Sequence, residues 1–450
     1  QAQDGHELWL RPVKAKPVTV ICKENSPTLS IAKQELLDRW QGENNATVTL
    51  TIKKDKALKT DGFRLGKNSV QAITDIGILY GVYELLRHQQ TGESIKKDEV
   101  DNPSYEVRIL DHWDNLNGTV ERGYAGNSIF WRKEDPFTVT EKDKTLWQQY
   151  ARANASIGIN ASVLDNVNAS PLILSTDYLS REKDIANVLR PYGIKVYLAV
   201  NFASPSTLGK LKTAAPLEAE VISWWKNKVK EIYSLIPDFG GFLVKASSEV
   251  QPGPQNYGRT HADGANMMAD ALKPYGGIVM WRAFVYSSNN EDRAKQAYDE
   301  FMPLDGKFRN NVIIQVKNGP IDFQPREPFS PLFGAMKKTS VMPEFQVTME
   351  YLGHAVYLVF LSTMWEECLK SDTWQQGKGS TVARCTDGSI YPQKYTAIAG
   401  VSNVGLDTNW TGHQFNQANW YAFGRLAWNN TLKSERIADE WIKLTFYGDT

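Results

Sequence analysis

A lysine and a glutamate four residues apart, Lys245 and Glu249, stand where a buried strand is expected to end. They follow Gly240-Gly-Phe-Leu-Val244, a short apolar run that is typical of such a strand. A loop rich in proline and glycine comes next, at 250–258. In barrel enzymes the catalytic residues stand where a strand ends and its loop begins. The two residues therefore mark a candidate active site.

Charged residues recur at the ends of further expected strands. They are the carboxylates Glu249, Asp322 and Glu350 and the cations Lys245, Arg282 and Lys317. Paired carboxylates are what glycoside hydrolysis needs, one as acid and one as base or nucleophile. Three cations in the same place indicate an anionic substrate, and the planar fork of an arginine suits a sugar carboxylate. The alternative is that these charges only neutralise one another in salt bridges. Asn115 and Trp281 are other strand-end candidates for substrate contact.

Hydrophobic patterns divide the chain into three parts. Residues 1–103 are predicted to form a small α/β domain, with strands at 18–22 and 47–52 and helices at 30–40 and 77–87. From 104 to 418, strands and helices alternate, which predicts a (β/α)8 TIM barrel of the α/β class. Its expected strands are 107–114, 159–166, 194–201, 241–247, 277–285, 311–316, 344–350 and 401–406, with helices such as 143–157, 217–236, 263–272 and 292–301. Residues 419–450 are the expected start of a helical C-terminal region that ends early.

Composition excludes several classes of function. Lys+Arg and Asp+Glu balance at 51 each among 450 residues, so no net charge favours nucleic acid or an anionic membrane. No apolar run is long enough for a transmembrane helix. The residues Cys22, Cys368 and Cys385 lack metal-ligand spacing, and we expect unpaired thiols, with a Cys368–Cys385 disulfide as the alternative. The 14 Trp, 19 Tyr and 17 Phe serve the core but also suit a sugar-binding cleft.

Other site chemistries find little support. His261 and Asp263 together with Glu249 could hold a metal, but there is no histidine pair at helical spacing, and Asp263 is better explained as a helix cap. No glycine-rich phosphate loop and no Gly-x-Ser-x-Gly element of a serine hydrolase is found. We therefore expect neither a metal nor a cofactor.

Three segments resemble the signatures of the bacterial α-glucuronidases of glycoside hydrolase family 67. They are Lys245-Ala-Ser-Ser-Glu249 with the loop to Asn266, Lys317-Asn-Gly-Pro-Ile-Asp322 with the loop to Ser330, and Met349-Glu350-Tyr-Leu-Gly353. The early loop Glu121-Arg-Gly-Tyr-Ala-Gly126 also matches, and the resemblance spans nearly the whole chain. Val250 departs from the pattern because it stands where the family is expected to have glycine.

The resemblance implies a xylan α-1,2-glucuronidase. Such an enzyme removes (4-O-methyl)glucuronic acid from the non-reducing terminal xylose of xylo-oligosaccharides and inverts the anomeric configuration. By this resemblance Glu249 is the general acid, and Asp322 and Glu350 form the base side. The uronate carboxylate would be held by Lys245, Arg282 and Lys317, and Trp131 would stack on sugar.

The same resemblance implies a homodimer where the full C-terminal domain is present. It also favours a periplasmic or secreted location, with the cytoplasm left open. Two alternatives remain: a glycoside hydrolase acting on another sugar, such as a hexosaminidase-like enzyme, and a non-catalytic protein that binds glucuronoxylan.

Overall fold

The N-terminal part of the chain is a five-stranded sheet with two helices. The computed structural model describes residues 4–96, 98–285 and 292–446. The strand order is β1-β2-β4-β3-β5, and β3 runs antiparallel to both its neighbours. The bounds are β1 Val18–Cys22, β2 Ala46–Ile52, β3 Phe63–Gly66, β4 Ser69–Ala72, β5 Glu99–Asp101, α1 Pro27–Arg39 and α2 Asp75–Thr91. The strands predicted at 18–22 and 47–52 are therefore confirmed.

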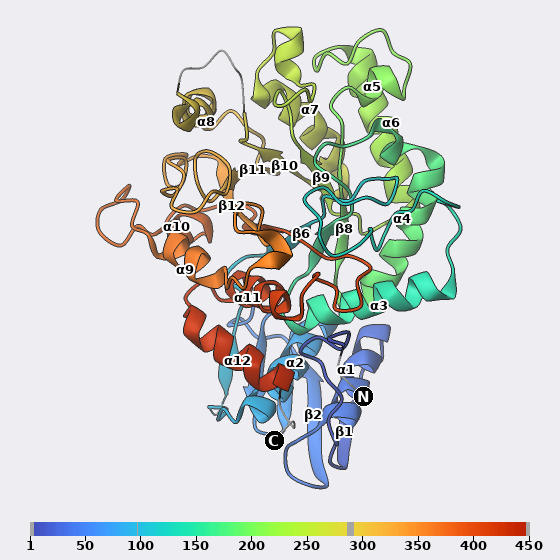
Figure 1. Ribbon diagram of the computed structural model, residues 1–450, viewed down its shortest axis with the longest axis vertical. Helices are drawn as coiled ribbons and strands as arrows, with labels where there is room; N and C mark the ends of the chain where they lie inside the picture. Colours follow the sequence, from blue (N-terminus) through green and yellow to red (C-terminus); the bar gives the residue numbers. More distant parts are fainter. Residues whose placement is uncertain (1–3, 97, 286–291, 447–450) are drawn as a thin grey trace.

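Eight parallel strands form a closed barrel above this sheet (Figure 1). They are β6 Val107–Asp111, β7 Ala161–Val163, β8 Lys195–Ala199, β9 Gly241–Val244, β10 Ile278–Arg282, β11 Val312–Lys317, β12 Ser340–Gln346 and β13 Ala397–Val401. The barrel closes where β13 pairs with β6, in the register of Val401 with Asp111. Strand and helix alternate along the chain as the sequence predicted, which confirms the TIM barrel.

The four barrel helices predicted from the sequence begin and end within two residues of the predicted positions. They are α3 Glu141–Ser156, α6 Ala219–Leu235, α7 His261–Leu272 and α8 Arg293–Phe301. The remaining barrel helices are α4 Thr176–Leu189, α5 Ser204–Thr207, α9 Ser362–Lys370 and α10 Val382–Thr386. The helix α7 starts with a capping box in which Thr260 and Asp263 bond to each other's backbone amides, so the capping role of Asp263 is confirmed.

Alternation along the strands separates apolar from charged side chains inside the barrel. Met280 of β10 and Ile313 of β11 belong to a buried apolar cluster within the barrel. Because successive side chains of a strand point to opposite faces, Arg282 and Lys317 share the inward face with these residues, at the next levels up. This alternation of side chains therefore places apolar residues in the interior of the barrel and charged residues at the carboxyl ends of the strands.

The last two barrel strands differ from the prediction. The seventh is 340–346 rather than 344–350, and the eighth is 397–401 rather than 401–406. Glu350 therefore stands four residues beyond β12, in a loop, and Glu344 is a strand residue with 0% exposure. The shift moves a buried glutamate, which the sequence analysis had not singled out, to the base of the candidate site.

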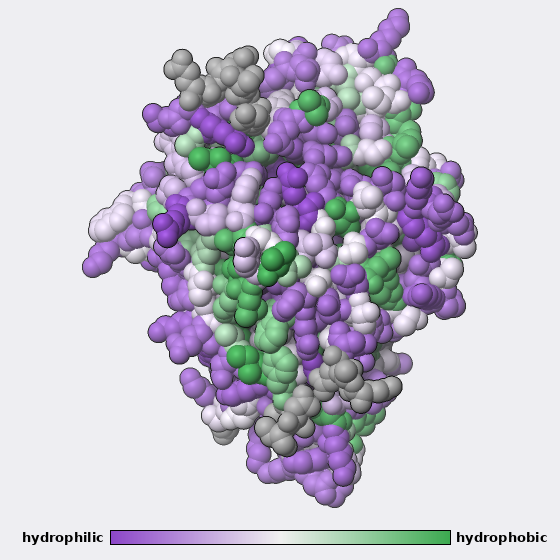
Figure 2. All heavy atoms as spheres, in the orientation of Figure 1, coloured by the Kyte–Doolittle hydropathy of each residue, from purple (hydrophilic) through white to green (hydrophobic). Residues whose placement is uncertain are grey.

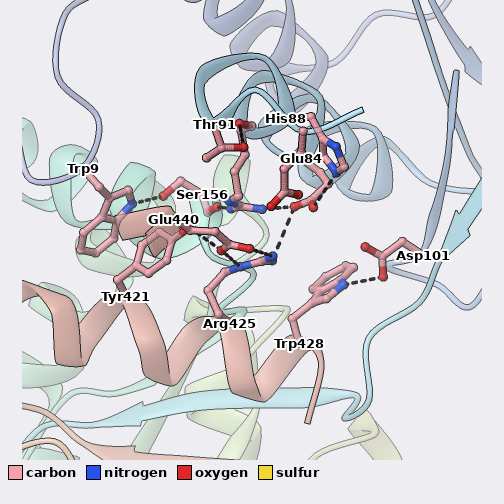
Figure 3. A network of polar contacts seen from close by, with 12 residues as sticks. Trp9, Glu84, His88, Thr91, Asp101, Ser156, Tyr421, Arg425, Trp428 and Glu440 are labelled. Atoms are coloured by element: carbon pink, nitrogen blue, oxygen red, sulfur yellow. Dashed lines mark hydrogen bonds and ion pairs between the residues drawn. The ribbon is translucent and has the colours of Figure 1, made fainter. Parts of the chain in front are cut away.

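Buried ion pairs join the C-terminal helices to the N-terminal sheet domain (Figure 3). The helices are α11 Gln417–Trp428 and α12 Ser434–Phe446. The Arg425 guanidinium of α11 lies 2.9 Å from the Glu440 carboxylate of α12 and 3.5 Å from that of Glu84 in α2. Trp428 donates from its indole nitrogen to Asp101, at 2.8 Å. Charges buried on three elements must remain paired, so this network fixes how the elements meet. Residues 447–450 of the predicted helical region lie outside the described part.

The face of the molecule drawn in Figure 2 is mainly polar in its upper part and carries a hydrophobic band lower down. Figure 2 shows this band over the part of the surface where Figure 1 draws α11 and α12. Exposed large hydrophobic residues of this region include Phe415 and Ile442. No helix in the described part of the chain is long and apolar enough to cross a membrane.

Candidate active site

A polar cavity of about 360 Å³ opens at the carboxyl ends of the barrel strands. All six predicted charged residues line it, which brings together groups from four different strand–loop segments. The lining residues are Trp113, Glu121, Arg122, Val167, Asn168, Lys245, Glu249, Arg282, Phe284, Lys317, Asp322 and Glu350. A concave site with convergent polar groups is the usual form of a small-molecule site.

Three cations converge on one buried phenylalanine ring at the base of this cavity. The ring of Phe284 lies 5.4 Å from the Lys245 ammonium, 5.5 Å from the Arg282 guanidinium and 3.6 Å from the Lys317 ammonium. Arg282 and Lys317 are the last residues of β10 and β11, and Lys245 follows the last residue of β9. The strands therefore hold a compact group of positive charges in place.

The three predicted catalytic carboxylates come from loops and reach back to cations. Glu249 lies 2.6 Å from the Lys245 ammonium. Asp322 forms an ion pair with Lys317 and accepts a hydrogen bond from the Tyr351 hydroxyl. Glu350 pairs with Arg122 and accepts a hydrogen bond from Gln346. Each carboxylate therefore has a different cation as its partner.

Arg282 is the most tightly bound of the cations. Its guanidinium makes two hydrogen bonds to the Glu344 carboxylate, at 3.0 and 2.8 Å, and both side chains are at most 2% exposed. Burial alone would lower the pKa of Arg282, but the Glu344 carboxylate outweighs it and raises the pKa. Arg282 is thus a fixed, fully charged donor at the base of the cavity.

Burial and neighbouring charges shift the pKa values of the two cavity lysines and of Asp322. Burial, and secondly the neighbouring Arg282, lower the pKa of Lys317 to about 8. The same two causes lower the pKa of Lys245, and the Glu249 carboxylate opposes them. Burial alone would raise the pKa of Asp322, but its pairing with Lys317 lowers it. Asp322 is therefore ionised in this state, as a base or water-positioning group must be.

The residues that support these groups were not predicted from the sequence. Glu121 accepts hydrogen bonds from Asn166 and Asn168, and Asn168 in turn accepts one from Lys245 at 2.9 Å. The position of Glu121 in the early loop signature could have indicated such a role. Phe284 could have been predicted as a site residue, because it lies two residues after Arg282 and side chains two residues apart in a strand point to the same face.

The other predicted contact residues do not line the cavity. Trp131 is 2% exposed and its indole donates to the Leu164 carbonyl, so it packs in the core rather than presenting a face to sugar. Trp281 is fully buried and donates to His261. Asn115 bonds to Thr119 and Asn166 beside the cavity. Trp113 and Phe284 are the aromatic residues that do line the cavity.

The residues considered as metal ligands are engaged elsewhere. His261 accepts from Trp281 and pairs with Glu300, and Asp263 belongs to the capping box. In residues 4–96, 98–285 and 292–446, no three His, Cys, Asp or Glu side chains are grouped so as to hold a metal ion. All three cysteines are free, as expected.

The backbone of the loop that carries Glu249 is strained. Ser247, Glu249 and Val250 have φ angles of 54°, 45° and 63°, in the left-handed region that L-residues disfavour. A β-branched residue is a marked outlier there, and the Val250 side chain is fully exposed and contributes little packing.

Val250→Gly is therefore expected to stabilise the chain by about 1 kcal/mol, because glycine adopts this φ without steric cost. Denaturant unfolding measures the difference. Val356→Gly is the control, since it removes an equally apolar exposed side chain, 80% accessible, without relieving a left-handed φ. Equal effects of the two substitutions would show that the loop holds no such strain.

A closed parallel barrel with carboxylates and cations at its strand ends is an architecture found in barrel hydrolases. Comparison of the sequence with models of known protein families identifies the family. A model described as glycosyl hydrolase family 67 middle domain matches residues 88–410, and one described as the C-terminus of the same family matches 411–450. The chain belongs to glycosyl hydrolase family 67.

Fungal alpha-glucuronidases are among the curated relatives of the chain. It is 48% identical over 400 residues to a probable alpha-glucuronidase A of Neosartorya fischeri, a match covering 86% of this chain and 47% of the relative. It is 45% identical over 404 residues to an alpha-glucuronidase of Hypocrea jecorina, covering 86% and 47%. The chain thus spans about half the length of these relatives.

Two solved structures of low sequence identity resemble the chain in fold. An N-acetyl-beta-hexosaminidase of Streptomyces plicatus superposes with a TM-score of 0.55 at 12% identity, covering 96% of this chain and 93% of that one. A GH20 exo-beta-N-acetylglucosaminidase of Vibrio harveyi gives 0.53 at 9% identity, covering 95% and 72%. These matches support the arrangement of a barrel with a preceding sheet domain.

Proposed function

We propose that the chain carries the catalytic site of an α-glucuronidase. The enzyme would remove (4-O-methyl)glucuronic acid from the non-reducing terminal xylose of xylo-oligosaccharides by an inverting acid/base mechanism. The observation that carries the proposal is the group of three cations around Phe284, surrounded by three carboxylates. A neutral sugar gives such a group of cations nothing to bind, whereas a uronate carboxylate matches it.

The residues divide the work between recognition and chemistry. Lys245, Arg282 and Lys317 would hold the uronate carboxylate at the base of the cavity, with the fixed guanidinium of Arg282 as the planar donor. Glu249, which is 45% exposed, would donate a proton to the leaving glycosidic oxygen. Asp322 and Glu350 would orient and deprotonate the attacking water.

A proton NMR time course with 4-O-methylglucuronosyl xylotriose tests this proposal. Early appearance of the β-anomer of free 4-O-methylglucuronate is expected, because one displacement by water inverts the α-linkage. Early appearance of the α-anomer would support the proposed substrate but overturn the inverting mechanism. Release of sugar from neutral aryl glycosides, with none from the uronide, would instead favour a hydrolase for another sugar.

A further inference from the structure

Every cation that lines the cavity already has a carboxylate partner. Lys245 pairs with Glu249, Lys317 with Asp322, Arg122 with Glu350, and Arg282 with Glu344. An incoming carboxylate therefore meets no unpaired cation among these four. It must share a partner or displace one of the protein's own carboxylates.

Three of the four pairs are secured by additional contacts. Glu344 and Arg282 are joined by two hydrogen bonds and are almost fully buried. Asp322 is also held by the Tyr351 hydroxyl, and Glu350 by the Gln346 amide. These carboxylates cannot leave their cations without breaking a second contact.

The pair of Lys245 and Glu249 is the exception. Within the described residues, the Glu249 carboxylate makes its one hydrogen bond to Lys245, and its side chain is 45% exposed. Lys245 is 3% exposed and remains anchored to Asn168 at 2.9 Å. The glutamate also stands in the strained loop, at a φ of 45°. Of the two partners, Glu249 is the one that is free to move out.

We infer that the carboxylate of the substrate displaces Glu249 from Lys245, so that binding of a uronate itself releases the general acid. This inference rests on the proposed function. One carboxylate replaces another on the ammonium, so Lys245 keeps a counter-ion while it stays buried. The freed Glu249 carboxylate takes one proton from solvent and gives it to the glycosidic oxygen as the bond to the sugar breaks.

The exchange makes proton donation by Glu249 depend on the charge of the substrate. A carboxylate oxygen that accepts a hydrogen bond from an ammonium has no proton to donate. A neutral sugar in the cavity leaves Lys245 without a new partner and Glu249 in place. The site would therefore discriminate against neutral glycosides twice, first in binding and again in the chemical step.

Calorimetric titration with glucuronic acid at neutral pH tests the exchange. If Glu249 competes with the ligand for Lys245, then Glu249→Gln should bind glucuronate about tenfold more tightly than the unsubstituted chain, because an uncharged amide is a weaker competitor. Glu249→Ala should show the same direction. In a Lys245→Met background, the gain from Glu249→Gln should vanish, because the contested cation is absent.

Glu350→Gln is the matched control, since it removes one negative charge from the same cavity but from Arg122. An equal gain in glucuronate affinity for both glutamine variants would mean that the loss of negative charge alone causes the effect, and it would overturn the exchange. Unchanged or weaker glucuronate binding by Glu249→Gln would also overturn it while leaving the proposed function intact. Failure of the unsubstituted chain and of every variant to bind glucuronate would overturn the proposed function itself.

Discussion

Glu249→Gln is expected to lower the turnover of 4-O-methylglucuronosyl xylotriose by about 10²–10⁴-fold, the usual contribution of a general acid. Glutamine preserves the size of the side chain but has no acidic proton for the leaving xylose oxygen. The loss should be much smaller on α-glucuronosyl fluoride, because fluoride leaves with little protonation. Initial rates on the two substrates give the comparison directly.

Glu350→Gln is the control for this prediction. A residue that activates water is needed whatever the leaving group, so this variant should lose activity on both substrates. Similar losses for Glu249→Gln on the fluoride and on the oligosaccharide would remove Glu249 from the role of acid. If the substrate carboxylate displaces Glu249 from Lys245, Glu249→Gln should also show a lower KM, while its kcat falls.

Glu344→Ala is expected to destabilise the chain by about 3–5 kcal/mol, because it leaves the Arg282 guanidinium buried without its counter-ion. The two side chains are 2% and 0% exposed, so water cannot replace the lost partner. Denaturant unfolding followed by tryptophan fluorescence measures the loss. Glu344→Gln should be milder, since an amide oxygen still accepts a hydrogen bond from the guanidinium.

Glu182→Ala separates the orphaned arginine from the simple loss of a buried glutamate. Glu182 is also 0% exposed, and its carboxylate oxygens find no hydrogen-bond partner among the described residues. Burial, and secondly the neighbouring Asp165, raise the pKa of Glu182 well above its ordinary value, and the nearby Lys228 forms its ion pair with Glu231 rather than with Glu182. If Glu182→Ala were as destabilising as Glu344→Ala, the ion pair with Arg282 would not be the cause.

The sequence predicted the barrel and its charged strand ends for a simple reason. In a barrel, an apolar run followed by a charged residue indicates a buried strand with a candidate active-site residue at its end, as at Val244 and Lys245. The exceptions have physical causes. Pro343 lies within β12, where a proline is unusual, and the alanines and the glycine of Ala397-Ile-Ala-Gly-Val401 have little β-propensity. Both strands were therefore expected several residues too late.

Side-chain partners were beyond the reach of sequence patterns. The displaced β12 concealed Glu344, and with it the fact that Arg282 is already neutralised. Aromatic content could not distinguish Trp131, which belongs to the core, from Trp113, which lines the cavity. Which carboxylate pairs with which cation depends on loop conformation, including left-handed residues at non-glycine positions that no propensity would favour.

The three cations around Phe284 belong to strands or their immediate ends, whereas Glu249, Asp322 and Glu350 belong to loops. Strand positions are fixed by the pairing of the whole barrel, but a loop tolerates exchange and insertion. Under the proposed function, altering three loops could therefore change the reaction of this scaffold while the strand cations keep the preference for an acidic sugar. Under the proposed function, affinity for uronates would be the inherited property of such a lineage, and the bond that is cleaved would vary.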